Sequence, residues 1–136
     1  MTEKAFLPLR FGFVAFVKRD CPTCELIVPV LEALDGLVSL VVYCQDDPSF
    51  PNEGQTLDDT DLEFSWRNRI ETVPTLLKVE DGREVGRVIG WHRAEWEELT
   101  QRAPLGSALP EMRPGCGSLS VDEENELDLM VRFDGT

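Results

Sequence analysis

Residues 21–24 read Cys-Pro-Thr-Cys, a C-x-x-C pair whose spacing occurs both in zinc sites and in redox-active disulfides. A structural zinc site needs two further cysteine or histidine ligands, usually as a second close pair. The remaining candidates, Cys44, His92 and Cys116, are isolated from one another in the sequence. The pattern therefore favours redox chemistry, and we expect neither a metal nor an organic cofactor.

The segments on either side of the pair predict a strand followed by a helix. Residues 11–17 are a dense run of β-branched and aromatic residues, which is typical of a buried strand. Apolar residues at 26, 27, 30, 31 and 34 then lie on one face of a helix, with Gly36 just past its end. A thiol at a helix N-terminus meets unpaired backbone N–H groups and the helix dipole, which favour the thiolate. We expect Cys21 to attack a partner disulfide and Cys24 to resolve the mixed disulfide.

Charged residues surround the pair. Lys18 and Arg19 place positive charge beside Cys21, where they would tune its thiolate, whereas Asp20 and Glu25 oppose them. Exposed charges a few ångströms apart are worth about 1 kcal/mol each, so the four nearly cancel. The helix N-terminus should therefore be the main influence that favours the thiolate form of Cys21.

Several motifs occur in the order found in the thioredoxin and glutaredoxin superfamily. Residues 16–24, with Pro29 five positions after the second cysteine, resemble its active-site turn. Residues 72–76, Thr-Val-Pro-Thr-Leu, look like its cis-proline motif. Asp-Gly at 81–82 looks like the turn of its last hairpin, and Gly90 like the glycine before its closing helix. The resemblance covers residues 10–102.

The resemblance implies an α/β thioredoxin-like fold. Its minimal core has the order β-α-β-α-β-β-α, with a central mixed four-stranded sheet flanked by helices. The sequence also indicates an acidic surface loop over residues 46–61. After the first strand and helix we expect a strand over 38–44, a helix over 57–69, a hairpin of 75–79 with 84–89, and a closing helix over 93–102.

The resemblance also implies a substrate groove beside the cysteine pair. The backbone next to Pro74 would pair with a bound substrate strand, as in β-augmentation. Trp91 suits the groove and ordinary core packing equally well, and His92 suits a helix start better than a catalytic base. The residues expected to line the groove are Val73, Pro74, Ile89, Gly90 and Trp91.

The sequence departs from both branches of the superfamily. Ala15 stands where thioredoxins carry a buried aspartate, and Asp20 replaces the tryptophan before the first cysteine. Lys18, Pro22 and residues 72–74 resemble glutaredoxins, which use glutathione. Residues 84–92, however, lack the second glycine and the aspartate with which glutaredoxins bind glutathione.

We divide the chain into a thioredoxin-like domain, residues 1–102, and an acidic extension outside the core, residues 103–136. Apolar residues from Leu119 onward could dock this extension onto the core or onto a partner. Cys44 ends an apolar strand and is expected to be an inert core residue. Cys116 lies in the extension between glycines and near an arginine. It is a candidate third redox thiol that takes over or protects the disulfide of the pair, and a plain surface cysteine is an equal alternative.

Composition limits the partners. The chain has 136 residues, 26 acidic against 13 basic, a net charge of −13 and 42% hydrophobic residues. Such a chain can form a globular core but has no basic stripe for nucleic acid or an anionic membrane. It also has no apolar run of roughly 20 residues and no signal-peptide cleavage site, so we expect a cytoplasmic protein. Acidic residues gather over 46–63 and 122–134, where a basic partner protein would dock.

Together these features predict a thiol–disulfide oxidoreductase that acts on protein disulfides and is supplied by a thiol electron donor. Two alternatives remain open. One is a non-catalytic redox-sensing or adaptor module, and the other is a glutathione-linked activity like that of glutaredoxins.

Overall fold

The apolar run before the two cysteines forms the central strand of a five-stranded sheet in the computed structural model, which describes residues 7–120. This strand, β1 (Phe11–Val17), is buried without interruption from Phe13 to Val17. A strand that is covered on both faces needs such a continuous apolar run. The prediction of a buried first strand is therefore confirmed.

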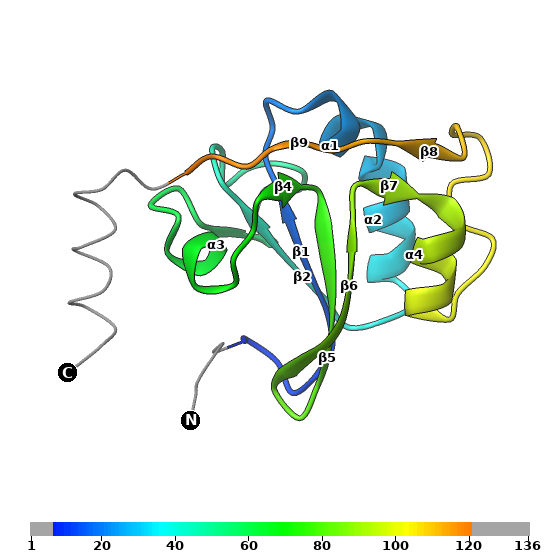
Figure 1. Ribbon diagram of the computed structural model, residues 1–136, viewed down its shortest axis with the longest axis horizontal. Coiled ribbons are helices and arrows are strands. Elements are labelled where there is room, and N and C mark those ends of the chain that lie inside the picture. The colour runs from blue at the N-terminus through cyan, green and yellow to red at the C-terminus, as the bar shows by residue number, and fades with distance from the viewer. Residues whose placement is uncertain (1–6, 121–136) are drawn as a thin grey trace.

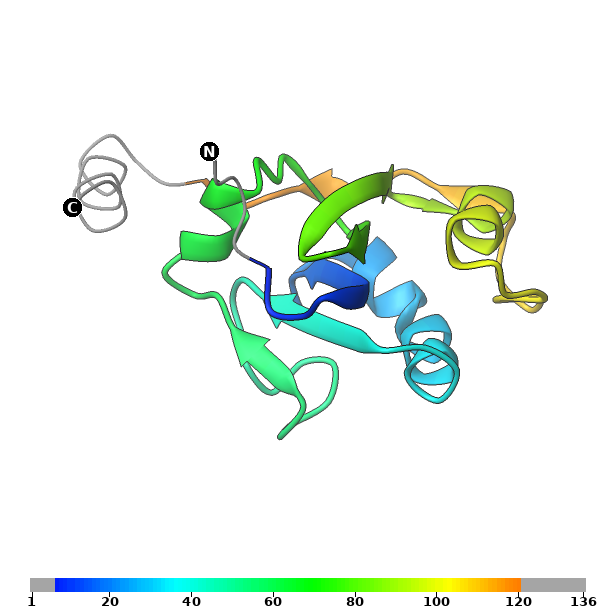
Figure 2. The same ribbon diagram turned by 90° about the horizontal axis from the view of Figure 1, so that it is seen from below.

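Helices cover both faces of the sheet. Figures 1 and 2 place α2 and α4 on one side of it and α3 on the other. After β1 the elements are α1 (Pro22–Leu26), α2 (Val28–Asp35), β2 (Leu40–Cys44), β3 (Thr56–Asp58), α3 (Glu63–Arg67), β4 (Thr72–Val73), β5 (Thr75–Glu80), β6 (Arg83–Ile89), β7 (Trp91–His92), α4 (Arg93–Thr100), β8 (Met112–Arg113) and β9 (Cys116–Gly117).

The sheet has the strand order β3-β2-β1-β5-β6. β1, β2 and β3 run parallel, whereas β5 is antiparallel to β1 and β6 is antiparallel to β5. This mixed sheet between helices is the thioredoxin-like α/β fold that the sequence predicts. It places the C-terminal ends of β1 and β2 at the same edge, where the two cysteines follow β1.

The sheet has one strand more than the four expected. Residues 56–58, predicted as part of an acidic loop and the start of a helix, instead pair in parallel with the outer edge of β2. The helix over 57–69 is correspondingly reduced to α3. Its first turn is held by Asp59, whose carboxylate accepts hydrogen bonds from the backbone N–H of Phe64 and Ser65 at 2.8 and 2.9 Å. A carboxylate in this position satisfies the donors that a helix start leaves unpaired.

Asp59 gives the stability of the protein a specific pH dependence. Its side chain is fully buried, and this burial raises its pKa to about 6, against the hydrogen bonds from Ser65 and Phe64. The folded state then binds the Asp59 proton more tightly than the unfolded state, so this stabilisation is present below pH about 4 and is lost as the pH rises through 6. We expect the free energy of unfolding of the wild type, relative to Asp59→Asn, to fall by up to about 3 kcal/mol between pH 4 and 7.

Urea unfolding of both proteins at each pH measures this difference. The comparison with Asp59→Asn cancels the other carboxylates, several of which titrate in the opposite sense. Two curves that stay parallel from pH 4 to 7 would contradict the prediction.

The helix after the cysteines is interrupted, although the sequence predicts one continuous apolar face. α1 ends at Leu26 and α2 begins at Val28, with Ile27 between them. The cause is Pro29, which has no N–H to donate to the carbonyl of the preceding turn. The apolar face survives the break, because Ile27, Val30 and Leu34 are all buried.

The last helix of the domain is α4, which begins at Arg93 as predicted. His92 caps it, and its Nδ1 accepts a hydrogen bond from the Glu95 N–H at 3.4 Å. Residues 103–120, expected as an appendage that could dock onto the core or onto a partner, run back across the domain (Figure 1). Leu105 is buried there, and β8 and β9 pair with β7 and β4. The acidic segment 122–134 lies outside the described residues, and within residues 7–120 no helix could span a membrane.

Candidate functional site

The cysteine pair lies at the turn from β1 into α1, where the sequence placed it. Cys21 is the N-cap of α1, and its Sγ accepts a hydrogen bond from the Cys24 N–H at 3.2 Å. Both side chains are buried, with at most 1% of either exposed. A sulfur that caps a helix accepts from a donor that would otherwise be unpaired, and a thiolate accepts better than a thiol. The turn therefore favours Cys21 as the nucleophile.

Cys24 has the surroundings of a resolving thiol. Burial, followed by its hydrogen bond with Cys21, raises the pKa of the Cys24 thiol well above its usual range. Cys24 consequently stays protonated at neutral pH and is no competitor to Cys21 as the attacking group. Ala15, which stands where thioredoxins carry an aspartate, is fully buried in β1.

The predicted substrate motif faces Cys21. The Val73–Pro74 peptide bond is cis, and the Val73 carbonyl oxygen lies 3.7 Å from the Cys21 sulfur, which donates to it. The Pro74 carbonyl accepts a hydrogen bond from the Gly90 N–H at 2.8 Å. Gly90 has φ of +76°, which an L side chain rarely adopts. Cys21, Val73, Pro74 and Gly90 are thus brought together, as the resemblance implies.

Trp91 is a core residue rather than an open groove residue. Only 1% of it is exposed, and its ring packs edge-on against Trp96 with centroids 5.4 Å apart. Its indole N–H donates to the Pro110 carbonyl at 2.8 Å. Ile89, by contrast, is 56% exposed beside the site. Of the two interpretations left open for Trp91, the structure favours packing.

The third cysteine lies directly against the pair. The Cys116 sulfur is 2.7 Å from the Cys21 sulfur, and Cys116 is half-buried. Burial, followed by the hydrogen bond with Cys21, raises the pKa of Cys116. The sequence singled out Cys116 but carried no signal for its position, which lies 95 residues along the chain from Cys21.

The two cations have different positions. The Lys18 ammonium donates to the Gly117 carbonyl at 2.7 Å, next to Cys116. The Arg19 guanidinium instead forms an ion pair with Asp47 at 2.7 Å and lies over the Phe50 ring. Lys18 therefore contributes charge to the site, whereas the charge of Arg19 is neutralised by Asp47.

Two polar residues for which the sequence predicted no role at the site, Gln45 and Asp46, bind the backbone around it. The buried Gln45 amide donates to Ser65 Oγ and Ser118 Oγ, both at 2.7 Å, and accepts from the Leu119 N–H at 3.0 Å. Asp46 accepts from the backbone N–H of Arg19 and of Asp20 at 2.6 and 3.0 Å. One sequence feature could have identified Gln45 and Asp46: they directly follow an apolar strand, at the edge of the sheet where the cysteines also lie.

Burial tends to raise the pKa of Asp46, but the backbone hydrogen bonds from Arg19 and Asp20 outweigh it and hold that pKa below its usual value. The Asp46 carboxylate also accepts from the Cys44 thiol at 3.3 Å. Cys44 is buried, and this burial raises its pKa to about 11. A protonated, enclosed thiol is unreactive, which is the behaviour expected of Cys44.

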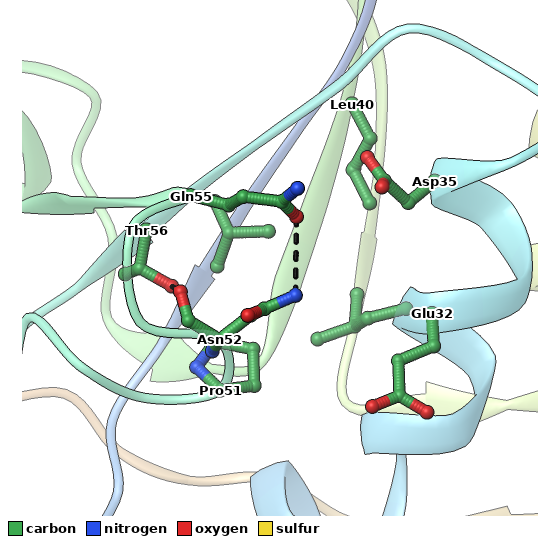
Figure 3. Close-up of a pocket in the computed structure, with 9 residues that line it drawn as sticks. Glu32, Asp35, Leu40, Pro51, Asn52, Gln55 and Thr56 are labelled. Atoms are coloured by element: carbon green, nitrogen blue, oxygen red, sulfur yellow. Dashed lines mark hydrogen bonds between the residues drawn. The ribbon is translucent and has the colours of Figure 1, made fainter.

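The molecule also has a pocket away from the cysteines. It measures about 540 Å³ and lies between α2 and residues 51–56 (Figure 3). Glu32 and Asp35 lie on one side of it, and the amides of Asn52 and Gln55 lie on the other. None of the cysteines lines it, and within residues 7–120 no cluster of histidine, cysteine or carboxylate side chains could hold a metal ion. This pocket is therefore separate from the cysteine turn.

Comparisons with known proteins find similarity to thioredoxins. No protein-family model matches the chain. It is 29% identical over 89 residues to a thioredoxin of Chlamydia caviae, covering 63% of this chain and 74% of that protein. The solved structure of a thioredoxin from Malassezia sympodialis is 22% identical, with a TM-score of 0.45 over 65% of this chain and 71% of that one. The sequence similarity to the bacterial thioredoxin agrees with the strand order of the sheet, which is that of a thioredoxin-like fold.

Proposed function

We propose that the protein is a thiol–disulfide oxidoreductase that acts on protein disulfides through Cys21 and Cys24. The observation that carries this proposal is the contrast between the two thiols. The Cys21 sulfur accepts a helix N–H and faces the Val73 backbone, whereas Cys24 lies behind it with a raised pKa. Cys21 is thus arranged to attack the substrate disulfide, and Cys24 to attack the mixed disulfide that results.

In the reducing direction, the Cys21 thiolate attacks one sulfur of a substrate disulfide and displaces the other as a thiolate, which takes up a proton. Cys24 then gives up its proton and attacks the Cys21 sulfur of the mixed disulfide. The second substrate sulfur leaves as a thiolate, and an intramolecular Cys21–Cys24 disulfide remains. A thiol electron donor would reduce this disulfide and complete the cycle.

The backbone at residues 72–74 would bind the substrate. β4 is a short strand whose backbone pairs with β9, and an extended substrate peptide would pair with it in place of β9. Pro74 would hold the Val73 carbonyl toward Cys21, so that the substrate cysteine arrives at the attacking sulfur. Gly90 would border the same groove through its bond to Pro74.

We further propose a cytoplasmic location and a basic partner protein for the acidic surface over residues 46–63. Exposed Asp58 belongs to this surface, together with the half-exposed Asp47. Binding to such a partner should weaken with added salt, because exposed charges are screened beyond about 10 Å at 0.1 M salt.

Turnover of an insulin-type disulfide tests the proposed function. With dithiothreitol or a thioredoxin reductase as donor, we expect many substrate disulfides to be reduced per protein molecule. A non-catalytic sensor would instead titrate once, after one equivalent of disulfide. Turnover that occurs only with glutathione and its reductase would show the glutaredoxin-like alternative, and would contradict direct action through a protein or dithiol donor.

A further inference from the structure

Residues 112–117 of the extension cross the cysteine site, where they form two short antiparallel strand pairs with the domain. β9 pairs with β4, which places Cys116 opposite Val73 and Gly117 opposite Thr72. β8 pairs with β7, which places Arg113 opposite Trp91. In Figure 1 the segment runs as one extended line over β4, α1 and β7. It therefore occupies the edge at which a substrate strand would add.

Side chains of the domain bind this segment at several points. Thr23, between the two cysteines, donates its hydroxyl to the Pro114 carbonyl at 2.7 Å. On the other side of Cys116, Lys18 donates to the Gly117 carbonyl. The buried Gln45 amide then holds the next two residues, Ser118 and Leu119. Groups on both sides of Cys116 thus fix its backbone while its sulfur faces Cys21.

We propose that residues 112–118 are an internal substrate: they occupy the peptide groove, and Cys116 exchanges with the Cys21–Cys24 disulfide to form a Cys21–Cys116 disulfide. This inference rests on the proposed redox function of the pair. In the oxidised protein the internal strand competes with external substrates for the same backbone edge and the same sulfur.

The exchange is balanced within the chain. The Cys116 thiol loses its proton, and its sulfur attacks the Cys21 sulfur of the Cys21–Cys24 disulfide. The Cys21–Cys116 bond forms as the Cys21–Cys24 bond breaks, and Cys24 leaves as a thiolate that takes up one proton. One disulfide and one thiol are present before and after, so no external oxidant or reductant is needed.

The groove also selects the residue that precedes the substrate cysteine. A Cβ on Gly115 would lie 2.5 Å from the Val73 carbonyl oxygen and 2.6 Å from a Thr72 methyl group. A Cβ on Gly117 would meet nothing within 4 Å. The groove thus accepts an extended Gly-Cys segment and tolerates a side chain after the cysteine. External substrates of the same class are protein disulfides whose cysteine follows a glycine in an extended, accessible segment.

The full-length Cys24→Ser protein tests the exchange partner. In a buffer of reduced and oxidised glutathione, with free thiols then alkylated, we expect peptide mapping to find most molecules with a Cys21–Cys116 link. Adding Gly115→Ala should lower the ratio of linked to unlinked protein at least tenfold. Gly117→Ala, two positions further along the same segment, should leave that ratio within twofold and is the matched control.

Two outcomes would overturn the inference: no Cys21–Cys116 link in Cys24→Ser beyond the mixed disulfide with glutathione, or equal effects of the two glycine substitutions on that link. The Cys24→Ser measurement needs no glycine substitution, so it decides the question even if Gly115→Ala folds poorly. Insulin turnover by the wild type is scored separately. Turnover without the link refutes the internal substrate alone, and the link without turnover refutes the catalytic function alone.

Discussion

Cys21→Ser should reduce the turnover of an insulin-type disulfide to the rate of dithiothreitol alone. A serine hydroxyl keeps the size and capping role of the side chain but cannot form a disulfide, so the first covalent step is lost. Cys24 cannot replace it, because burial raises its pKa and encloses it behind Cys21. The measurement is the initial rate of insulin precipitation at equal protein and dithiothreitol concentrations.

Cys44→Ser is the matched control for this loss. Cys44 is also buried, but it donates to Asp46 and has no part in the proposed exchange. We expect Cys44→Ser to keep a rate close to that of the wild type wherever the variant remains folded. Residual catalysis by Cys21→Ser, or an equal loss in Cys44→Ser, would contradict the assignment of Cys21 as the nucleophile.

Much of the fold could be predicted from local pattern alone. The uninterrupted apolar run of residues 11–17 predicts a strand buried on both faces, and β1 is the centre of the sheet. The hairpin of β5 and β6 follows from an Asp-Gly turn between two apolar runs. The edge strand β3 could not be predicted in this way, because its last two residues are exposed and its pairing with β2 depends on contacts distant in sequence.

The site shows the same division between local and distant information. The helix start that positions Cys21 is encoded in the residues next to it. The pairing of β9 with β4 is not, because backbone hydrogen bonds hold residues 116–117 against residues 72–73 and leave no side-chain periodicity to detect. The ion pair of Arg19 could not be predicted either, because its partner Asp47 lies 28 residues away in the sequence.

The opposite side of the groove depends on the core beneath it. Trp96 in α4 is fully buried, packs edge-on against Trp91 and donates its indole N–H to the Gly90 carbonyl at 2.8 Å. Gly90 in turn donates to the Pro74 carbonyl. Packing in the closing helix is thereby connected, through two hydrogen bonds, to the backbone that faces Cys21.

Trp96→Ala should therefore lower the free energy of unfolding by about 3–5 kcal/mol, because it leaves a large cavity. Trp96→Phe keeps much of the apolar volume but leaves the Gly90 carbonyl unpaired, and we expect a loss of about 1–3 kcal/mol. Urea unfolding measures both, with Leu37→Ala as the control, since Leu37 is 54% exposed and should change the stability by less than about 1 kcal/mol.

The Phe variant separates the two roles of Trp96. If the bond to Gly90 positions the groove, then Trp96→Phe should raise the KM for a protein disulfide under conditions in which it is still fully folded, and Leu37→Ala should not. A stability loss without any change in KM would show that Trp96 acts on the core alone. An unfolding free energy of Trp96→Ala within 1 kcal/mol of the Leu37→Ala value would contradict the packing around Trp91 and Gly90 from which both expectations are drawn.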